Sequence, residues 1–158
     1  MSGKVSEKVL TAAQRFLFDP GISVVRAARA AADTGAAKAM HDPTEGGVLA
    51  GLLEMALAAR LGICVFADQV TILPETRDIC AALRLDPLAL LASGALLIGV
   101  PADHAARVTD SLAAQRIPAT VVAELRPPED GYRLRRGGEV RELNFPQRDE
   151  LARLFEIQ

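Results

Sequence analysis

The segment from Val48 to Leu61 constrains the fold of this chain more strongly than any other feature. Only Glu54 and Arg60 carry a charge in this long apolar run. A helix of such composition has no broad polar face to turn toward water, so it must be buried on most sides. The rest of the chain therefore has to supply layers that cover a central helix.

The segments around this helix alternate between strand and helix patterns. Short apolar runs predict strands at 36–41, 63–66, 95–100 and 119–125. Helical periodicity predicts further helices at 5–18, 23–32, 74–83, 102–115 and 146–155. The apolar run at 95–100 is typical of a central strand that is covered on both faces.

Gly137-Gly138 predicts a tight hairpin near the end of the chain, between strands at 132–136 and 139–143. Pairing across this loop sets Arg136 against Glu139 and brings opposite charges together. A hairpin is antiparallel, whereas strands separated by helices are commonly parallel. We therefore predict an α/β (α+β) fold, a layered mixed β-sheet with helices packed on it.

The length of 158 residues is that of one ordinary domain. No repeat, low-complexity stretch or convincing linker divides the chain. We expect a single domain over 1–158, with an N-terminal helix in 1–19, a core in 20–125, and the hairpin and terminal helix in 126–158.

Charge and composition exclude several classes of function. The formal charge of −2 is spread evenly, and aromatic residues make up only 4% of the chain, so nothing indicates binding to nucleic acid. The longest uncharged run, 87–102, is too short to cross a bilayer, and residues 1–4 lack the order of a signal peptide. Cys64 and Cys80 are sixteen positions apart and indicate reduced packing residues, with a disulfide as the alternative, and nothing supports a zinc site. We expect a cytoplasmic protein.

The strongest chemical signal lies at 40–48, where a predicted strand ends and the central helix begins. Backbone N–H groups and the positive end of the helix dipole converge at such a junction and attract phosphate. Gly46 and Gly47 allow a ligand to approach the backbone closely, and the Thr44 hydroxyl can donate a hydrogen bond.

Two acidic residues of the same loop, Asp42 and Glu45, can hold Mg²⁺ against phosphate oxygens. A structural interpretation remains open beside this one. In it, Thr44 is an ordinary N-cap, Glu45 complements the helix dipole in the first turn, and the two glycines let the helix pack tightly.

Two further residues near the loop have more than one interpretation. His41 beside Asp42 can form a general base with an orienting carboxylate, although adjacent strand residues point to opposite faces. Glu54 can extend to solvent, hydrogen-bond a neighbouring loop or point into a cleft.

A series of motifs continues on both sides of the loop. In chain order they are Pro20-Gly21-Ile22-Ser23-Val24-Val25, Met40-His41-Asp42-Pro43-Thr44-Glu45-Gly46-Gly47, Leu52-Leu53-Glu54-Met55-Ala56, Ile72-Leu73-Pro74-Glu75-Thr76, Leu85-Asp86-Pro87-Leu88 and Ala92-Ser93-Gly94-Ala95-Leu96-Leu97. Together they resemble the C-terminal domain of the aminoimidazole ribonucleotide (AIR) synthase superfamily, the PurM-like enzymes. The resemblance covers roughly 20–125 and is strongest in the hydrogenase-maturation, HypE-like branch.

The resemblance implies ATP-dependent activation of an oxygen or similar nucleophile by phosphoryl transfer. Enzymes of the superfamily join an N-terminal domain, which pairs with its dimer mate and supplies acidic ligands for Mg²⁺ and ATP, to a C-terminal α/β domain that closes the cleft. The chain resembles only the second domain. We therefore expect the N-terminal ATP-binding domain to be absent and the chain to be inactive alone.

The kinase branch of the superfamily has an equivalent loop that reads Asp-x-Ser-Asp-Gly. By that similarity, Asp42 and Glu45 match metal-binding positions and Thr44 matches the hydroxyl that contacts phosphate. Glu45 is also a departure, because the hydrogenase-maturation branch more often has Arg there. The hydrogenase-maturation dehydratases also carry their substrate group on a C-terminal cysteine, whereas this chain finishes in Ile157-Gln158.

Two hypotheses follow from the sequence. In the first, the chain is the C-terminal domain of an ATP-dependent enzyme and binds a nucleotide or phosphorylated small molecule at the loop. In the second, it is a non-catalytic ligand-binding or oligomerisation module that kept the fold, with a homodimer as one form of assembly.

Overall fold

The structure is a computed structural model and describes residues 5–145 and 150–156. The residues outside these ranges include the first four and the start of the predicted C-terminal helix at 146–149. The α-helices are α1 (Glu7–Arg15), α2 (Val25–Ala32), α3 (Gly47–Ala59), α4 (Pro74–Leu83), α5 (Ala105–Ala114) and α6 (Glu150–Glu156). The strands are β1 (Ala39–His41), β2 (Gly62–Phe66), β3 (Leu97–Gly99), β4 (Ala123–Arg126), β5 (Tyr132–Arg136) and β6 (Glu139–Glu142). Short helical turns occur at η1 (Leu17–Gly21), η2 (Ala67–Gln69), η3 (Ala102–His104) and η4 (Pro128–Asp130).

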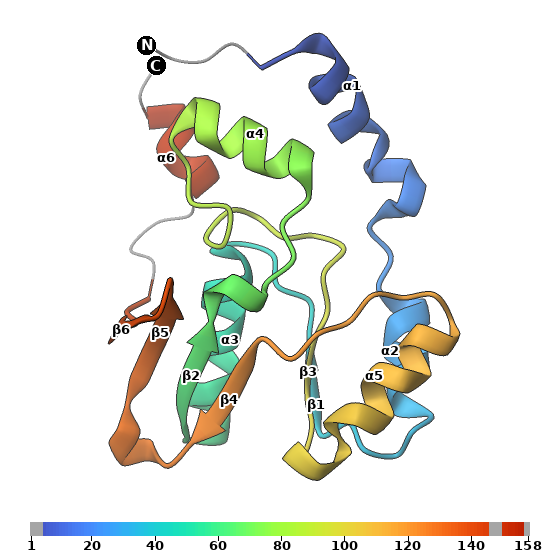
Figure 1. The fold of residues 1–158 in the computed structure, drawn as a ribbon, viewed down its shortest axis with the longest axis vertical. Helices are drawn as coiled ribbons and strands as arrows, with labels where there is room; N and C mark the ends of the chain where they lie inside the picture. Colours follow the sequence, from blue (N-terminus) through green and yellow to red (C-terminus); the bar gives the residue numbers. More distant parts are fainter. Residues whose placement is uncertain (1–4, 146–149, 157–158) are drawn as a thin grey trace.

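The larger sheet has four strands in the order β4-β2-β5-β6 (Figure 1). Strand β2 runs antiparallel to β4 and parallel to β5, and β5 and β6 form the antiparallel hairpin. The hairpin has the predicted register, with Arg136 opposite Glu139 and Arg133 opposite Glu142. The predicted mixed sheet with packed helices is therefore confirmed.

The smaller sheet consists of β1 and β3, which pair in antiparallel fashion with Met40 opposite Ile98. The prediction that 95–100 is a central strand was wrong. Within the described ranges, β3 has β1 as its sole strand neighbour, and its apolar residues are covered by helices instead. Of the residues at 95–100 only Leu97 is buried and the others are half-buried, so the apolar run overstated the burial and carried no information about which strands pair.

Helix α3 packs against both sheets, with contacts to β2, β1 and β3 (Figure 1). Leu53 and Ala56 of this helix are fully buried. They belong to the larger core cluster together with Val65 of β2 and Leu134 of β5. The prediction of a helix that is buried on most sides is confirmed for its first half, whereas Glu54 and the last turn at 57–59 are exposed. The packing of the first half fixes the position of the loop before α3.

A second cluster of small apolar residues joins α2 and α5 to the smaller sheet. Ala30 and Ala31 pack with Val108 and Leu112, and Ile98 of β3 lies against them. Alanine side chains allow the two helices to come close together. The strand pair β1–β3 is thus held between this cluster and α3.

Helix α1 lies at the edge of the fold, where it contacts α4 and has no buried residue (Figure 1). In the part of the chain that the structure describes, no helix combines the length and the apolar composition needed to cross a membrane.

Candidate functional site

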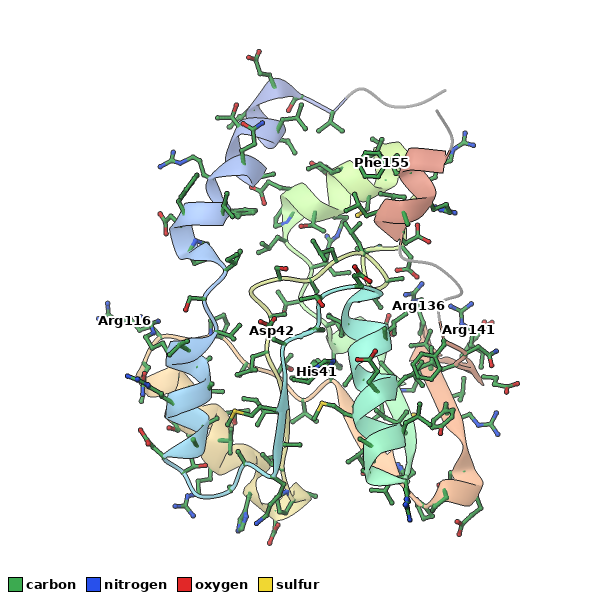
Figure 2. The ribbon with its side chains drawn as sticks, turned by 180° about the vertical axis from the view of Figure 1, so that it is seen from behind. His41, Asp42, Arg116, Arg136, Arg141 and Phe155 are labelled. Carbon is green, nitrogen blue, oxygen red and sulfur yellow. The ribbon has the colours of Figure 1, made fainter. Side chains whose placement is uncertain are left out.

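The candidate loop connects the end of β1 at His41 to the start of α3 at Gly47. Figure 2 shows His41 and Asp42 at this end of β1, beside α3. Asp42, Thr44 and Glu45 are exposed to solvent. The loop therefore presents two carboxylates and a hydroxyl beside the N-terminus of a buried helix.

Gly46 and Gly47 are buried, and protein atoms occupy the space beside each of them. A Cβ on Gly47 would lie 2.4 Å from the carbonyl oxygen of Leu90 and 2.7 Å from that of Leu88. A Cβ on Gly46 would lie 2.6 Å from the Ala50 Cβ. Both glycines also have positive φ, 71° and 64°, which favours glycine. Packing of the backbone at 88–90 thus accounts for Gly47, and the close approach of Ala50 in α3 accounts for Gly46, as the structural interpretation expected.

The first amides of α3 also have partners within the protein. The Gly47 N–H donates to the Thr44 carbonyl at 3.2 Å, and the Leu49 N–H donates to the Leu88 carbonyl at 3.1 Å. A ligand at this helix end therefore meets fewer free amides than the strand-to-helix junction predicted.

The predicted N-cap at Thr44 was wrong. The capping position belongs to Gly46, and no side chain makes the capping hydrogen bond. Glu45 likewise precedes the helix instead of lying in its first turn. A capping role thus explains neither Thr44 nor Glu45. Both residues lie in the loop before α3, with their side chains exposed to solvent.

His41 and Glu54 form the closest polar contact near the loop, with 2.7 Å between His41 Nε2 and Glu54 Oε2. The His41 side chain is 34% exposed and that of Glu54 is 55% exposed. The carboxylate partner of His41 is therefore Glu54, not the adjacent Asp42. Of the alternatives for Glu54, the structure shows the hydrogen bond, which the Glu54 carboxylate accepts from His41 at the end of β1 and not from a loop.

Gly51 makes this contact possible, and sequence reasoning missed it. A Cβ on Gly51 would lie 2.9 Å from the Pro43 Cβ and 3.0 Å from the His41 Cδ2. The absence of a side chain lets the histidine ring lie against α3, one turn before Glu54. A glycine three residues before the acidic residue, inside an otherwise apolar helix, was the available signal.

Mg²⁺ would find only part of its coordination shell here. Among the residues described, no three His, Cys, Asp or Glu side chains lie together as a metal site. Asp42 and Glu45 can supply carboxylate oxygens, and Mg²⁺ commonly takes one or two carboxylates together with phosphate and water. The pair fits a metal that arrives with a phosphorylated ligand and does not form a complete metal cage.

The mixed sheet, the buried central helix and the loop that precedes it define an α/β domain of the AIR synthase type. Residues 16–133, about three quarters of the chain, match the family described as AIR synthase related protein, C-terminal domain. The chain belongs to this family.

Relatives in hydrogenase maturation support the same assignment. A hydrogenase expression/formation protein of Methanocaldococcus jannaschii is 39% identical over 74 residues, which are 47% of this chain and 22% of the relative. The crystal structure of Escherichia coli HypE, a hydrogenase maturation protein, superposes with a TM-score of 0.72 at 29% identity, over 83% of this chain and 42% of that one. A structure of HypE in complex with ATP shares the fold, with a TM-score of 0.66 at 24% identity, over 74% of this chain and 38% of that one. The resemblance to the HypE-like branch is confirmed, and the chain spans less than half the length of these proteins.

Proposed function

We propose that this chain is the C-terminal domain of an AIR synthase-related, ATP-dependent enzyme, folded as a single domain over 1–158. In this proposal it contributes a phosphate-binding loop to phosphoryl-transfer chemistry and is inactive alone. An N-terminal AIR synthase-like domain, on the same or a separate chain, would complete the ATP site. A homodimer is one form of assembly open to the domain.

One observation carries the proposal, namely that the polar residues of the loop are exposed to solvent while its two glycines are buried. The side chains of Asp42, Thr44 and Glu45 reach solvent, whereas Gly46 and Gly47 are packed against protein. Two carboxylates and a hydroxyl that are open to solvent beside a helix N-terminus are groups that a phosphate with its metal ion can reach. The ATP complex of a HypE with the same fold supports a nucleotide as the ligand.

Each exposed residue has a distinct role in this proposal. The Thr44 hydroxyl donates a hydrogen bond to a phosphate oxygen. Asp42 and Glu45 would hold Mg²⁺ that accompanies the phosphate, and the ion would supply positive charge beside the transferring group. Gly47 lets the start of α3 pack against the backbone at 88–90, and Gly46 lets the loop pack against Ala50. Gly46 and Gly47 therefore position the site without touching the ligand.

A non-catalytic binding or oligomerisation module is the second candidate, and a different observation favours it. The Gly47 and Leu49 amides already donate to protein carbonyls, and no complete metal site lies among the described residues. A domain that kept the fold and lost the chemistry would have these properties.

Calorimetric titration of the protein with ATP and Mg²⁺ separates the two candidates. We expect Thr44→Val and Asp42→Asn each to weaken nucleotide binding by about tenfold, because each removes one hydrogen bond or ligand to a charged group. Thr120→Val and Asp110→Asn, which change exposed residues elsewhere, serve as matched controls. Equal affinity for all five proteins, or no binding by any of them, would favour the second candidate.

A further inference from the structure

A second candidate site lies on the other side of the turn that packs onto α3. It is an open cavity of about 320 Å³ between η2, α4, the turn at 86–88 and the tip of the β5–β6 hairpin. Each of these four elements contributes one charged residue to the lining, namely Asp68, Arg77, Asp86 and Arg136. Arg136 ends β5 at the tip of the hairpin (Figure 2). None of the residues predicted to bind phosphate at the loop belongs to this cavity.

The two carboxylates of the cavity are already engaged by the protein backbone. Asp68 Oδ2 accepts a hydrogen bond from the Gly137 N–H at 2.8 Å, which ties η2 to the hairpin. Asp86 Oδ1 accepts one from the Leu88 N–H at 3.0 Å, which shapes the turn at 86–88. These acidic residues thus have structural partners and build the walls of the cavity.

The two arginines are less fully engaged than the carboxylates. Arg136 Nη2 lies 3.4 Å from Asp86 Oδ2, a long contact between half-exposed side chains. Arg77, in the first turns of α4, makes no ion pair with any residue in the described ranges. A guanidinium carries five N–H donors and binds carboxylate or phosphate through two of them at once. The two arginines and two aspartates of the lining balance in formal charge, so what the cavity offers an anion is the unused N–H donors of the arginines.

Apolar side chains form the remainder of the lining. Val70 and Ile72 are half-buried and Leu88 is 2% exposed, and all three belong to or pack against the larger core cluster. A volume of this size is at the lower end of the range for small-molecule sites, which combine apolar walls with a few polar groups. The lining fits a ligand with one oxyanion and a small apolar body.

We propose that this cavity binds a small organic anion, a carboxylate or a phosphate ester, with its oxyanion held by Arg77 and Arg136. The apolar part of the ligand lies against Val70 and Leu88. The cavity is linked to the start of α3, because the carbonyl of its lining residue Leu88 accepts a hydrogen bond from the Leu49 N–H. Its lining does not include Thr44 or any other residue of the candidate loop.

Titrations followed by amide NMR test the proposal with three probes of similar shape, namely benzoate, phenyl phosphate and the neutral benzamide. We expect saturable shifts at Asp68, Leu88 and Gly137 for at least one anion, with a Kd on the order of 1 mM. Benzamide should produce no such shifts. Tighter binding of benzoate would show that the cavity prefers a carboxylate, and tighter binding of phenyl phosphate would show that it prefers a phosphate ester.

Arg77→Gln and Arg136→Gln should each weaken binding by about tenfold, the ratio typical of a lost charge-assisted hydrogen bond. Arg107→Gln, an exposed arginine on α5, is the matched control and should leave the affinity unchanged. Val70→Phe keeps both arginines and fills the cavity, so it should also prevent binding. The proposal is overturned if neither anion binds, if benzamide binds equally well, or if the arginine variants bind as the control does. Nucleotide binding at Thr44 is measured separately and can succeed or fail independently.

Discussion

His41 Nε2 and Glu54 Oε2 lie 2.7 Å apart and join the end of β1 to the middle of α3. The contact spans thirteen residues of sequence and encloses the candidate loop between its two ends. Because Gly51 lets the ring approach the helix, the pair fixes the direction in which the chain leaves β1. The loop that carries Asp42 and Thr44 therefore starts from a fixed point.

Removal of this contact should have a modest effect on stability. Both side chains are partly exposed, so solvent screens the pair, and we expect Glu54→Gln to lower the free energy of unfolding by about 0.5–1 kcal/mol. Urea unfolding of Glu54→Gln, His41→Gln and the double variant measures the coupling between the two side chains. Glu129→Gln, an exposed acidic residue in η4, is the control. Additive effects of the two single substitutions would show that the contact contributes nothing.

Gly47→Ala should destabilise the protein far more than the same change in the hairpin loop. Gly47 and Gly137 have similar φ, 64° and 59°, so the backbone strain of an added Cβ is alike, roughly 1 kcal/mol. At Gly47 the Cβ would also meet the Leu90 carbonyl at 2.4 Å, whereas nothing lies within 4 Å at Gly137. We expect a loss of about 3 kcal/mol or more at Gly47. Equal losses in thermal or urea unfolding would show that the backbone at 88–90 does not pack there in solution.

Patterns of neighbouring residues correctly predicted one helix and the hairpin, because the proline at the helix start and the turn glycines determine these elements locally. The helix at 74–83 has the predicted bounds, Pro74–Leu83, and the Gly137-Gly138 hairpin has the predicted register. The pairing of β3 with β1 was not predictable in this way, because strands that are distant in sequence carry no local signal for their partner.

The candidate site shows the same division between local and long-range information. The loop at 42–47 was located from its strand-to-helix pattern, and its polar residues are exposed as a binding site requires. Gly47 was predicted to let a ligand approach the backbone, but the space beside it is filled by the backbone at 88–90, some forty residues away in the sequence. Glu54 likewise became the partner of His41 only because the helix and the strand lie side by side. Sequence thus indicated where the site is but not what fills the space around it.

Leu134→Ala should destabilise the fold by about 2–5 kcal/mol, as is usual for a truncated core leucine. Leu134 is 1% exposed and lies in the larger core cluster. The matched control is Val140→Ala on the neighbouring strand, where the side chain is 60% exposed. We expect a loss below about 0.5 kcal/mol for the control. Similar losses for the two variants in urea unfolding would contradict the placement of the hairpin on the core.

The thiol of Cys80 should be less reactive than that of Cys64 and should make stability depend on alkaline pH. Cys80 is 2% exposed, and its burial, with smaller contributions from Asp86 and Glu150, raises the pKa of the thiol. The folded state therefore keeps a proton that the unfolded state loses above about pH 8.5. The stabilisation is complete below that pH and is lost as pH rises through the raised pKa.

Two measurements check the behaviour of Cys80. A thiol reagent should modify Cys64, which is half-buried, several times faster than Cys80. Above about pH 8.5 the free energy of unfolding should fall more steeply for the wild-type protein than for Cys80→Ala. Because Cys80→Ala also lowers the free energy of unfolding at every pH, the two proteins are compared by how steeply this free energy changes with pH. Equal slopes and equal modification rates would refute the assignment.

The most direct test of the proposed phosphate-binding loop is an amide NMR titration of the protein with ATP and Mg²⁺. The proposal predicts saturable shifts at Asp42, Thr44 and Glu45 that are lost in Thr44→Val and retained in Thr120→Val. The Leu49 amide should shift little, because it already donates to the Leu88 carbonyl. Unchanged resonances throughout 42–48 at saturating nucleotide would contradict the proposal and leave the loop with a purely structural role.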